Sequence, residues 1–198
     1  AVREAIGPGI ALMVDANHAY DTTAAIRLGR MIEPCDIGWF EEPVPPEDLA
    51  GYRDVRAALS IPVAGGECEF TRFGFRDVLV SRAMDVIQPD TCAAGGLSEC
   101  RKIADMAEAF GVRYNPHVWG TGIAIAASLQ LLAVLPSHTP LSLAPLEPML
   151  EFDRTEHPIR QAILTQPIEH VRGVVTVPEG PGLGIEVDRE AVSRFAVR

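Results

Sequence analysis

The sequence predicts an α/β fold in which strands and helices alternate, and more specifically a barrel of the TIM type. Short, mainly apolar runs of strand length alternate with helix-length stretches along most of the chain. Each run is followed by a polar residue, and these polar residues recur at a nearly constant interval. Such alternation is typical of parallel strands joined by right-handed crossovers. An interval of about 25 residues is the length of one strand-helix unit.

Five runs are predicted to be strands. They cover residues 10–14, 37–40, 61–64, 85–88 and 112–115. The polar residues that follow them are Asp15, Glu41, Glu67, Asp90 and His117, which are 26, 26, 23 and 27 residues apart. In a (β/α)₈ barrel the carboxyl ends of the strands meet on one face, where the chemistry is done. We therefore expect these five side chains to point into one shared cavity.

Four stretches between the runs are predicted to be helices. They cover residues 22–34, 49–60, 72–83 and 96–111. In the last of them Leu97, Cys100, Ala104, Ala107 and Phe110 follow the three-to-four spacing of an amphipathic helix. Gly111 stands where a glycine would end that helix.

The rival architecture is an open, doubly wound sheet. Such a sheet normally carries a glycine-rich phosphate-binding turn after its first strand. The segment "DANHAYD" after the first run is not such a turn. The barrel is therefore favoured.

Composition narrows the class of protein. The chain has 198 residues, is 47% hydrophobic, and has neither an 18-residue apolar run nor the start of a signal peptide. We expect a cytoplasmic protein with no membrane partner. A net charge of −10 without a basic cluster argues against nucleic acid. The four cysteines form no Cys-x-x-Cys pair, so we expect reduced thiols and no structural zinc.

Asp15, Glu41 and Glu67 are predicted metal ligands. Three carboxylates cannot all stay ionised in a confined site without a cation, and oxygen donors suit Mg²⁺, with Mn²⁺ as a substitute. Asn17 is placed to add a polar contact. In the pair Glu41-Glu42, one carboxylate should bind the metal while its neighbour is held by a partner of its own. For any single acid, an ordinary solvent-facing strand end is the alternative.

Asp90 and His117 form the second predicted group. An aspartate that accepts a hydrogen bond from one imidazole nitrogen fixes the tautomer and leaves the other nitrogen free to act as a base. A purely structural histidine is the alternative. The other four histidines are expected to be solvated: His18, His138, His157 and His170.

The motifs "LMVDAN", "WFEEP", "GGE", "QPD" and "PHVWG", in this order and spacing, resemble the mandelate racemase and muconate-lactonising group of the enolase superfamily. The resemblance implies that Asp15, Glu41 and Glu67 bind Mg²⁺. It also implies that Asp90 and His117 move a proton α to a carboxylate. Glu151 in "MLEFD" would hydrogen-bond the substrate carboxylate or the developing enediolate, with Glu147 as a competitor. Trp119 either walls the pocket or packs in the core.

Longer segments, such as "PHVWGTGIAIAASLQLLA", look most like the galactarolactone and anhydrogalactonate cycloisomerase branch. That branch opens a cyclic sugar acid by removing the α proton and expelling a ring oxygen from the β carbon, which gives a 2-keto-3-deoxy sugar acid. The alternatives are a dehydratase of acyclic sugar acids, a racemase or epimerase, a metal-dependent aldolase or hydrolase, and a metal-binding remnant without catalysis.

Two features of the resembled group do not occur in this sequence. One is a Lys-x-Lys motif at the second barrel strand, since Lys102 is the only lysine. The other is an N-terminal capping domain. We therefore expect a partial barrel over residues 1–165, with a sixth strand near 141–152, and a tail over 166–198 that packs toward the capping domain. The residues should belong to a longer polypeptide, implied by resemblance to be a homo-oligomer such as an octamer, and should aggregate and be inactive alone.

Overall fold

The computed structural model describes residues 1–135 and 149–196. Its centre is a five-stranded sheet in which every neighbouring pair is parallel. The strands are β1 (Leu12–Asp15), β2 (Ile37–Glu41), β3 (Val63–Gly65), β4 (Val86–Ile87) and β5 (Arg113–Tyr114). All five predicted strands are therefore present. Most of the sixth, near 141–152, lies outside the described residues, and the described part from 149 onward has no strand.

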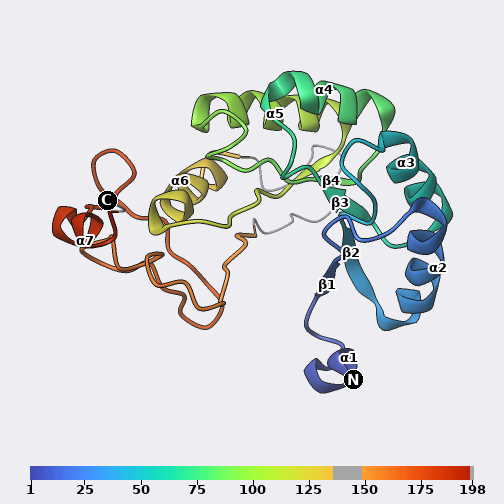
Figure 1. The fold of residues 1–198 in the computed structure, drawn as a ribbon, viewed down its shortest axis with the longest axis horizontal. Coiled ribbons are helices and arrows are strands. Elements are labelled where there is room, and N and C mark those ends of the chain that lie inside the picture. Colours follow the sequence, from blue (N-terminus) through green and yellow to red (C-terminus); the bar gives the residue numbers. More distant parts are fainter. Residues whose placement is uncertain (136–148, 197–198) are drawn as a thin grey trace.

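The structure has the following helices: α1 (Val2–Ile6), α2 (Thr22–Ile32), α3 (Leu49–Ala58), α4 (Thr71–Ser81), α5 (Leu97–Phe110), α6 (Gly122–Leu132) and α7 (Arg189–Arg194), with a 3₁₀ turn η1 (Glu33–Cys35) after α2. Helices α2 to α6 form an arc around the sheet, whereas α1 and α7 lie apart from it near the two ends of the chain (Figure 1). The four predicted helices correspond to α2, α3, α4 and α5. Pro34 lies in the 3₁₀ turn, which explains why α2 ends before the predicted boundary.

The strand order decides between the two architectures. The strands lie side by side in chain order, from β1 to β5. A doubly wound sheet reverses direction at a switch point, whereas a barrel adds each new strand beside the previous one. The sequential order confirms the barrel type.

Local signals fix the helix ends. Asp21 and Asp48 each precede a helix and accept a hydrogen bond from a backbone amide of its first turn, at 2.8 Å. Gly111 ends α5 in the left-handed region, with φ of 68°, as predicted. The predicted apolar stripe of α5 is correct at its centre, where Cys100, Ala104 and Ala107 are buried, and wrong at its ends, where Leu97 and Phe110 are exposed.

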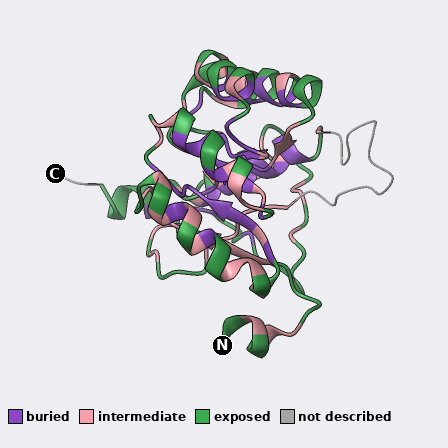
Figure 2. Cartoon of the chain, turned by 90° about the vertical axis from the view of Figure 1, so that its right-hand side faces the viewer, coloured by how far each residue is buried: buried purple, intermediate pink, exposed green. Residues whose placement is uncertain are grey.

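The main core lies between the sheet and the helices that surround it. Figure 2 shows buried strands and helices whose outer faces are exposed. The largest side chains of this core are fully buried: Phe40, Tyr52, Phe75, Leu79, Ile87 and Ile103. A smaller cluster on the other face of the sheet is made by Trp39, Ala64 and Val86.

A β-bulge divides β2. Leu12 pairs with Ile37 but Met13 pairs with Trp39, so Gly38 has no partner in β1. Because side chains alternate between faces, one extra residue moves all later side chains to the opposite face. Ile37 and Phe40 accordingly pack against the helices, whereas Trp39 lies on the inner face.

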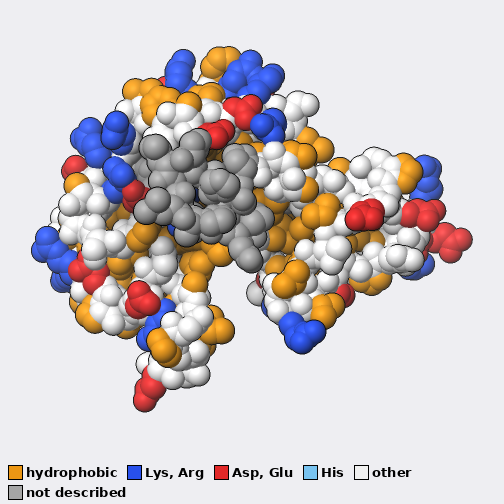
Figure 3. Space-filling view, turned by 180° about the vertical axis from the view of Figure 1, so that it is seen from behind, with side chains coloured by type: hydrophobic (Ala, Val, Ile, Leu, Met, Phe, Trp, Pro, Cys, Tyr) orange, Lys and Arg blue, Asp and Glu red, His pale blue; other side chains and the backbone are white. Residues whose placement is uncertain are grey.

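The C-terminal part packs on α6. Ile168, Val175 and Val177 join Ile125 and Leu129 in a second hydrophobic cluster. Within the described residues, no helix is both long and apolar enough to cross a bilayer. Figure 3 shows one face of the molecule, where Lys and Arg side chains are scattered along the outer rim among acidic ones.

Truncation of Phe75 tests the main core. Phe75 is fully buried, so Phe75→Ala should lower the free energy of unfolding by about 3–5 kcal/mol. Phe73, on the same helix, is 58% exposed and lies under the Arg72 guanidinium at 5.0 Å. Phe73→Ala should cost less than about 1 kcal/mol. Urea unfolding measures both, and equal losses would contradict this description of the core.

Candidate active site

The carboxyl ends of the strands bring most of the predicted site residues together. Asp15 and Glu41 are paired at the ends of β1 and β2. Glu67 follows β3, Asp90 follows β4 and His117 follows β5. The geometry of the individual side chains shows what this edge of the sheet can do.

Asp90 and His117 make direct contact. The distance from Nδ1 of His117 to Oδ2 of Asp90 is 2.8 Å. The other oxygen of Asp90 accepts hydrogen bonds from the backbone amides of Cys92 at 2.7 Å and Ala93 at 2.8 Å. Burial opposes the charged form of Asp90, but these hydrogen bonds outweigh it and lower its pKa. Asp90 is thus a fixed, ionised acceptor for the imidazole.

The second nitrogen of His117 faces an acid. Its Nε2 lies 3.4 Å from Oε2 of Glu67. Burial disfavours the imidazolium, but the hydrogen bond with Asp90 and the charges of Glu151 and Glu67 outweigh burial and raise the pKa of His117 to about 9. His117 therefore stands among negative charges.

The carboxyl groups of Glu41 and Glu67 are harder to ionise than ordinary glutamates. Glu41 is buried, and its Oε2 accepts a hydrogen bond from the indole of Trp39 at 2.8 Å. Burial is the main cause that raises the pKa of both carboxyls, and the charge of Asp15 adds to it in each case. A cation held among Asp15, Glu41 and Glu67 would offset this repulsion, and three carboxylates are the oxygen donors that Mg²⁺ takes. The donor set therefore fits a hard divalent cation.

The predicted triad is not tightly gathered. Oxygens of Asp15, Glu41 and Glu67 do not all lie within 4.8 Å of one another. In the part of the chain that the structure describes, the group of three potential metal ligands that does meet this distance is His18, Glu42 and Cys68. Its members lie beside the predicted site residues but are not among them.

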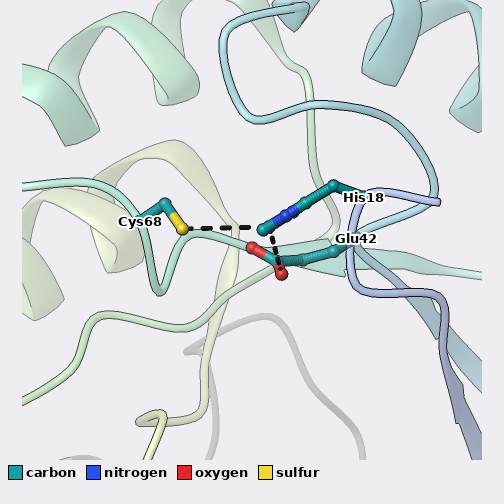
Figure 4. A group of neighbouring side chains, drawn as sticks. All are labelled: His18, Glu42 and Cys68. Atoms are coloured by element: carbon teal, nitrogen blue, oxygen red, sulfur yellow. Dashed lines mark hydrogen bonds and ion pairs between the residues drawn. The ribbon is translucent and has the colours of Figure 1, made fainter.

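Glu42 has the partner that the sequence required. Its carboxylate is 1% exposed, and Oε2 lies 2.6 Å from Nε2 of His18 (Figure 4). The backbone amide of His18 also donates to the carbonyl of Glu42 at 2.8 Å. The prediction that His18 is solvated is thus wrong, because the loop after β1 folds over the end of β2. Burial, followed by the charges of Glu67, Asp15 and Glu41, raises the pKa of Glu42 to about 8.

The remaining predicted residues have different positions. Glu151 lies beside the pair formed by Asp90 and His117, where its Oε2 accepts a hydrogen bond from the backbone amide of Val118 at 2.6 Å. Asn17 reaches Asp15 through its backbone amide, at 2.8 Å. Trp119 is 65% exposed, so the alternative of core packing is wrong for it. Glu147 lies outside the described residues.

The other histidines differ from the expectation in one further case. His170 is exposed, as expected, and its ring packs edge-on to Phe152. His157 is only partly exposed, and its Nδ1 is buried with no hydrogen-bond partner among the described residues. His138 lies outside those residues.

Two contacts were not predicted. The indole of Trp39 could have been found, because residues two apart on a strand share a face and Trp39 stands two before Glu41. The approach of Cys68 to His18 had no such signal, since the two residues lie in loops that are 50 residues apart.

The comparisons with known proteins agree with this geometry. Residues 1–191 match the family described as enolase C-terminal domain-like, and the chain belongs to this family. The resemblance to the mandelate racemase and muconate-lactonising group of the enolase superfamily is thereby confirmed.

Individual relatives point to sugar-acid enzymes. The chain is 54% identical over 195 residues to D-galactarolactone cycloisomerase of Agrobacterium fabrum, which covers 98% of this chain and 51% of that protein. It is 33% identical over 187 residues to arabinonate dehydratase of Saccharolobus solfataricus, covering 94% of this chain and 48% of that protein. The chain thus spans about half the length of the curated relatives it matches.

Solved structures give the same picture. The 3,6-anhydro-D-galactonate cycloisomerase of Zobellia galactanivorans superposes with a TM-score of 0.90 at 44% identity, covering 100% of this chain and 53% of that one. An enolase from Bradyrhizobium, crystallised with magnesium and mandelic acid, superposes with a TM-score of 0.82 at 34% identity, covering 100% and 49%.

The charge around His117 predicts how stability depends on pH in metal-free protein. The folded-state pKa of about 9 exceeds the ordinary value of 6.5. Protonated His117 therefore favours the folded state fully below pH 6.5, and this contribution is lost as pH rises through 9. With a chelator present, the urea concentration at the unfolding midpoint should fall as the pH rises from 6.5 to 9. This fall should be less steep for His117→Asn. Equal slopes for the two proteins would contradict the assignment.

Proposed function

We propose that the protein carrying this chain removes the proton α to the carboxylate of a sugar acid or its lactone, and then expels a group from the β carbon. The contact between Asp90 and His117, beside Glu67, is the observation that carries this proposal. The relatives support the substrate class, since they are a galactarolactone cycloisomerase and sugar-acid dehydratases.

His117 acts as the base in this proposal. Asp90 accepts a hydrogen bond from Nδ1–H of His117. A cation held by Glu67 would offset the negative charge that raises the pKa of His117, so that Nε2 is deprotonated and has a lone pair for the α proton. The imidazolium that forms is stabilised by Asp90 and by the facing carboxylate of Glu67. His117 can then return the proton to a leaving oxygen on the β carbon.

Asp15, Glu41 and Glu67 would hold a Mg²⁺ ion in this proposal, with Mn²⁺ as a substitute. When bound, the ion supplies positive charge that stabilises the negative charge developing on the substrate carboxylate. Trp39 would keep the Glu41 carboxylate in one orientation through its indole hydrogen bond. Magnesium in the crystals of the related Bradyrhizobium enolase supports this assignment.

Glu151 and two neighbours would contact the substrate. Glu151 lies at the backbone of Val118, next to the base, where it would hydrogen-bond the substrate carboxylate or the developing enediolate. Exposed Trp119 would form part of the pocket wall. Asn17 would present its side chain beside Asp15, because its backbone amide is already bonded there.

Ring opening of a lactone is the preferred form of the reaction. The relative at 54% identity is a cycloisomerase, whereas the dehydratases match at 30 to 35%. Dehydration of an acyclic acid shares the α-proton step and differs in the leaving group, and a racemase or epimerase would omit elimination. Separate incubations with D-galactarolactone and with the open galactarate distinguish the two reactions. A 2-keto-3-deoxy acid formed from the lactone indicates ring opening, and one formed from galactarate indicates dehydration.

The whole protein is proposed to be a cytoplasmic homo-oligomer, up to an octamer, that acts on small molecules. Four free cysteines fit a reducing compartment. We divide the chain into a partial barrel over residues 1–165 and a tail over 166–198. That tail would contact a capping domain of the same protein.

His117→Asn tests the base. Exchange of the substrate α proton with D₂O should fall by about 10²- to 10⁴-fold, because asparagine cannot accept the proton. NMR of the substrate measures this rate in protein purified from its source, and calorimetry measures Mg²⁺ binding. Magnesium affinity should stay nearly unchanged.

Glu67→Gln is the matched variant for the metal site. It should weaken Mg²⁺ binding, because an amide replaces a charged ligand. Loss of metal in His117→Asn would overturn the division between base and ligands. Metal binding without α-proton exchange in the unmodified protein would instead favour a metal-binding remnant.

A further inference from the structure

A second group of potential ligands lies beside the proposed magnesium site. His18 comes from the loop after β1, Glu42 follows β2, and Cys68 follows β3. Figure 4 shows the tip of the imidazole pointing toward both the carboxylate and the thiol. Its Nε2 lies 2.6 Å from Oε2 of Glu42 and 3.8 Å from Sγ of Cys68. One atom of each ligand type thus faces the other two.

The carboxylate in this group has no hydrogen bond among the described residues. The side chain of Glu42 is 1% exposed, and both of its oxygens are buried without a hydrogen-bond donor. His18 is the neighbour of this carboxylate at 2.6 Å, but the imidazole offsets the negative charge only when it is protonated. A buried carboxylate in this condition is costly unless a cation compensates it.

We propose that His18, Glu42 and Cys68 form a binding site for a soft divalent cation of the Zn²⁺ class, separate from the carboxylate triad. Nitrogen, oxygen and sulfur donors in one group are those that Zn²⁺ takes, with water as a fourth ligand. Mg²⁺ prefers oxygen ligands alone. Zinc binding displaces the thiol proton of Cys68 into solvent and leaves a thiolate on the metal.

The geometry requires only a small adjustment. Bonds of about 2.0 Å to nitrogen or oxygen and about 2.3 Å to sulfur place tetrahedral ligands about 3.3–3.5 Å apart. The distance from His18 to Cys68 is slightly longer than this. The Glu42 oxygen must move away from His18 by roughly 0.7 Å. Cys68 is exposed and can approach from solvent.

The site differs from the structural zinc site that the cysteine spacing excludes. That type needs several cysteines at short spacing, whereas this one uses a single cysteine. It is also independent of the proposed function, because it can be tested without substrate.

Protection of Cys68 from alkylation tests the proposal in the unmodified protein. With Mg²⁺ in excess, Zn²⁺ should slow the reaction of Cys68 with iodoacetamide at least about tenfold, because a metal-bound thiolate is a poor nucleophile. Cys92, which is also exposed and free, is the internal control and should react at an unchanged rate. Peptide mass spectrometry reads both residues in one sample. Equal rates for Cys68 with and without zinc would overturn the site.

Cobalt substitution identifies the ligands. Co²⁺ bound to a thiolate gives a charge-transfer absorption band, which Cys68→Ser should abolish and Cys92→Ser should retain. His18→Gln should weaken Zn²⁺ binding about tenfold or more. Zinc affinity that is unchanged in Cys68→Ser would place the metal elsewhere, for example on the carboxylate triad, and would refute the proposal. Cys68 is exposed, so this variant should keep the fold.

Discussion

Two adjacent buried carboxylates at the end of β2 impose the main electrostatic constraint on this molecule. Glu41 and Glu42 cannot share one environment without strong mutual repulsion. They are separated because neighbouring residues of a strand point in opposite directions. Glu41 turns to the inner face and is held by Trp39, whereas Glu42 turns away and meets His18. The end of β1 and the loop after it serve both, since β1 supplies Asp15 to one side and the loop supplies His18 to the other.

Consecutive residues also face different groups in the turn after β3. Glu67 faces the base, while Cys68, the next residue, faces Glu42 and His18. Two groups with different donor chemistry are thus built back to back from consecutive residues. The inner group contains carboxylates and an imidazole at the strand ends. The outer group mixes nitrogen, oxygen and sulfur. A shared backbone couples their positions while their ligands stay chemically distinct.

The sequence was sufficient for the five strands β1 to β5, for the helices α2 to α5 and for the polar residues at the strand ends. Those features follow periodic rules, and the regular interval placed Asp90 next to His117 correctly. Loop contacts follow no period. The adjacent charges of Glu41 and Glu42 showed that one of them needs a partner, but the sequence did not identify that partner as His18. The exposure of Trp119 depends on the path of a single loop. How closely the carboxylate oxygens of Asp15, Glu41 and Glu67 approach one another depends on their side-chain conformations, which no sequence pattern records.

The unpaired Gly38 in β2 limits how this segment can vary in length. Trp39 and Glu41 reach the inner face only because one additional residue precedes them in the strand. Loss of that residue would exchange the two faces for the rest of β2, turning the indole toward the helices and moving the Glu42 carboxylate inward. The loops that lead from a helix into the next strand carry none of these side chains and have no such parity. Insertions and deletions are therefore compatible with this architecture between the helices and strands, but a change of one residue between Ile37 and Glu42 would exchange the chemical identities of the two groups.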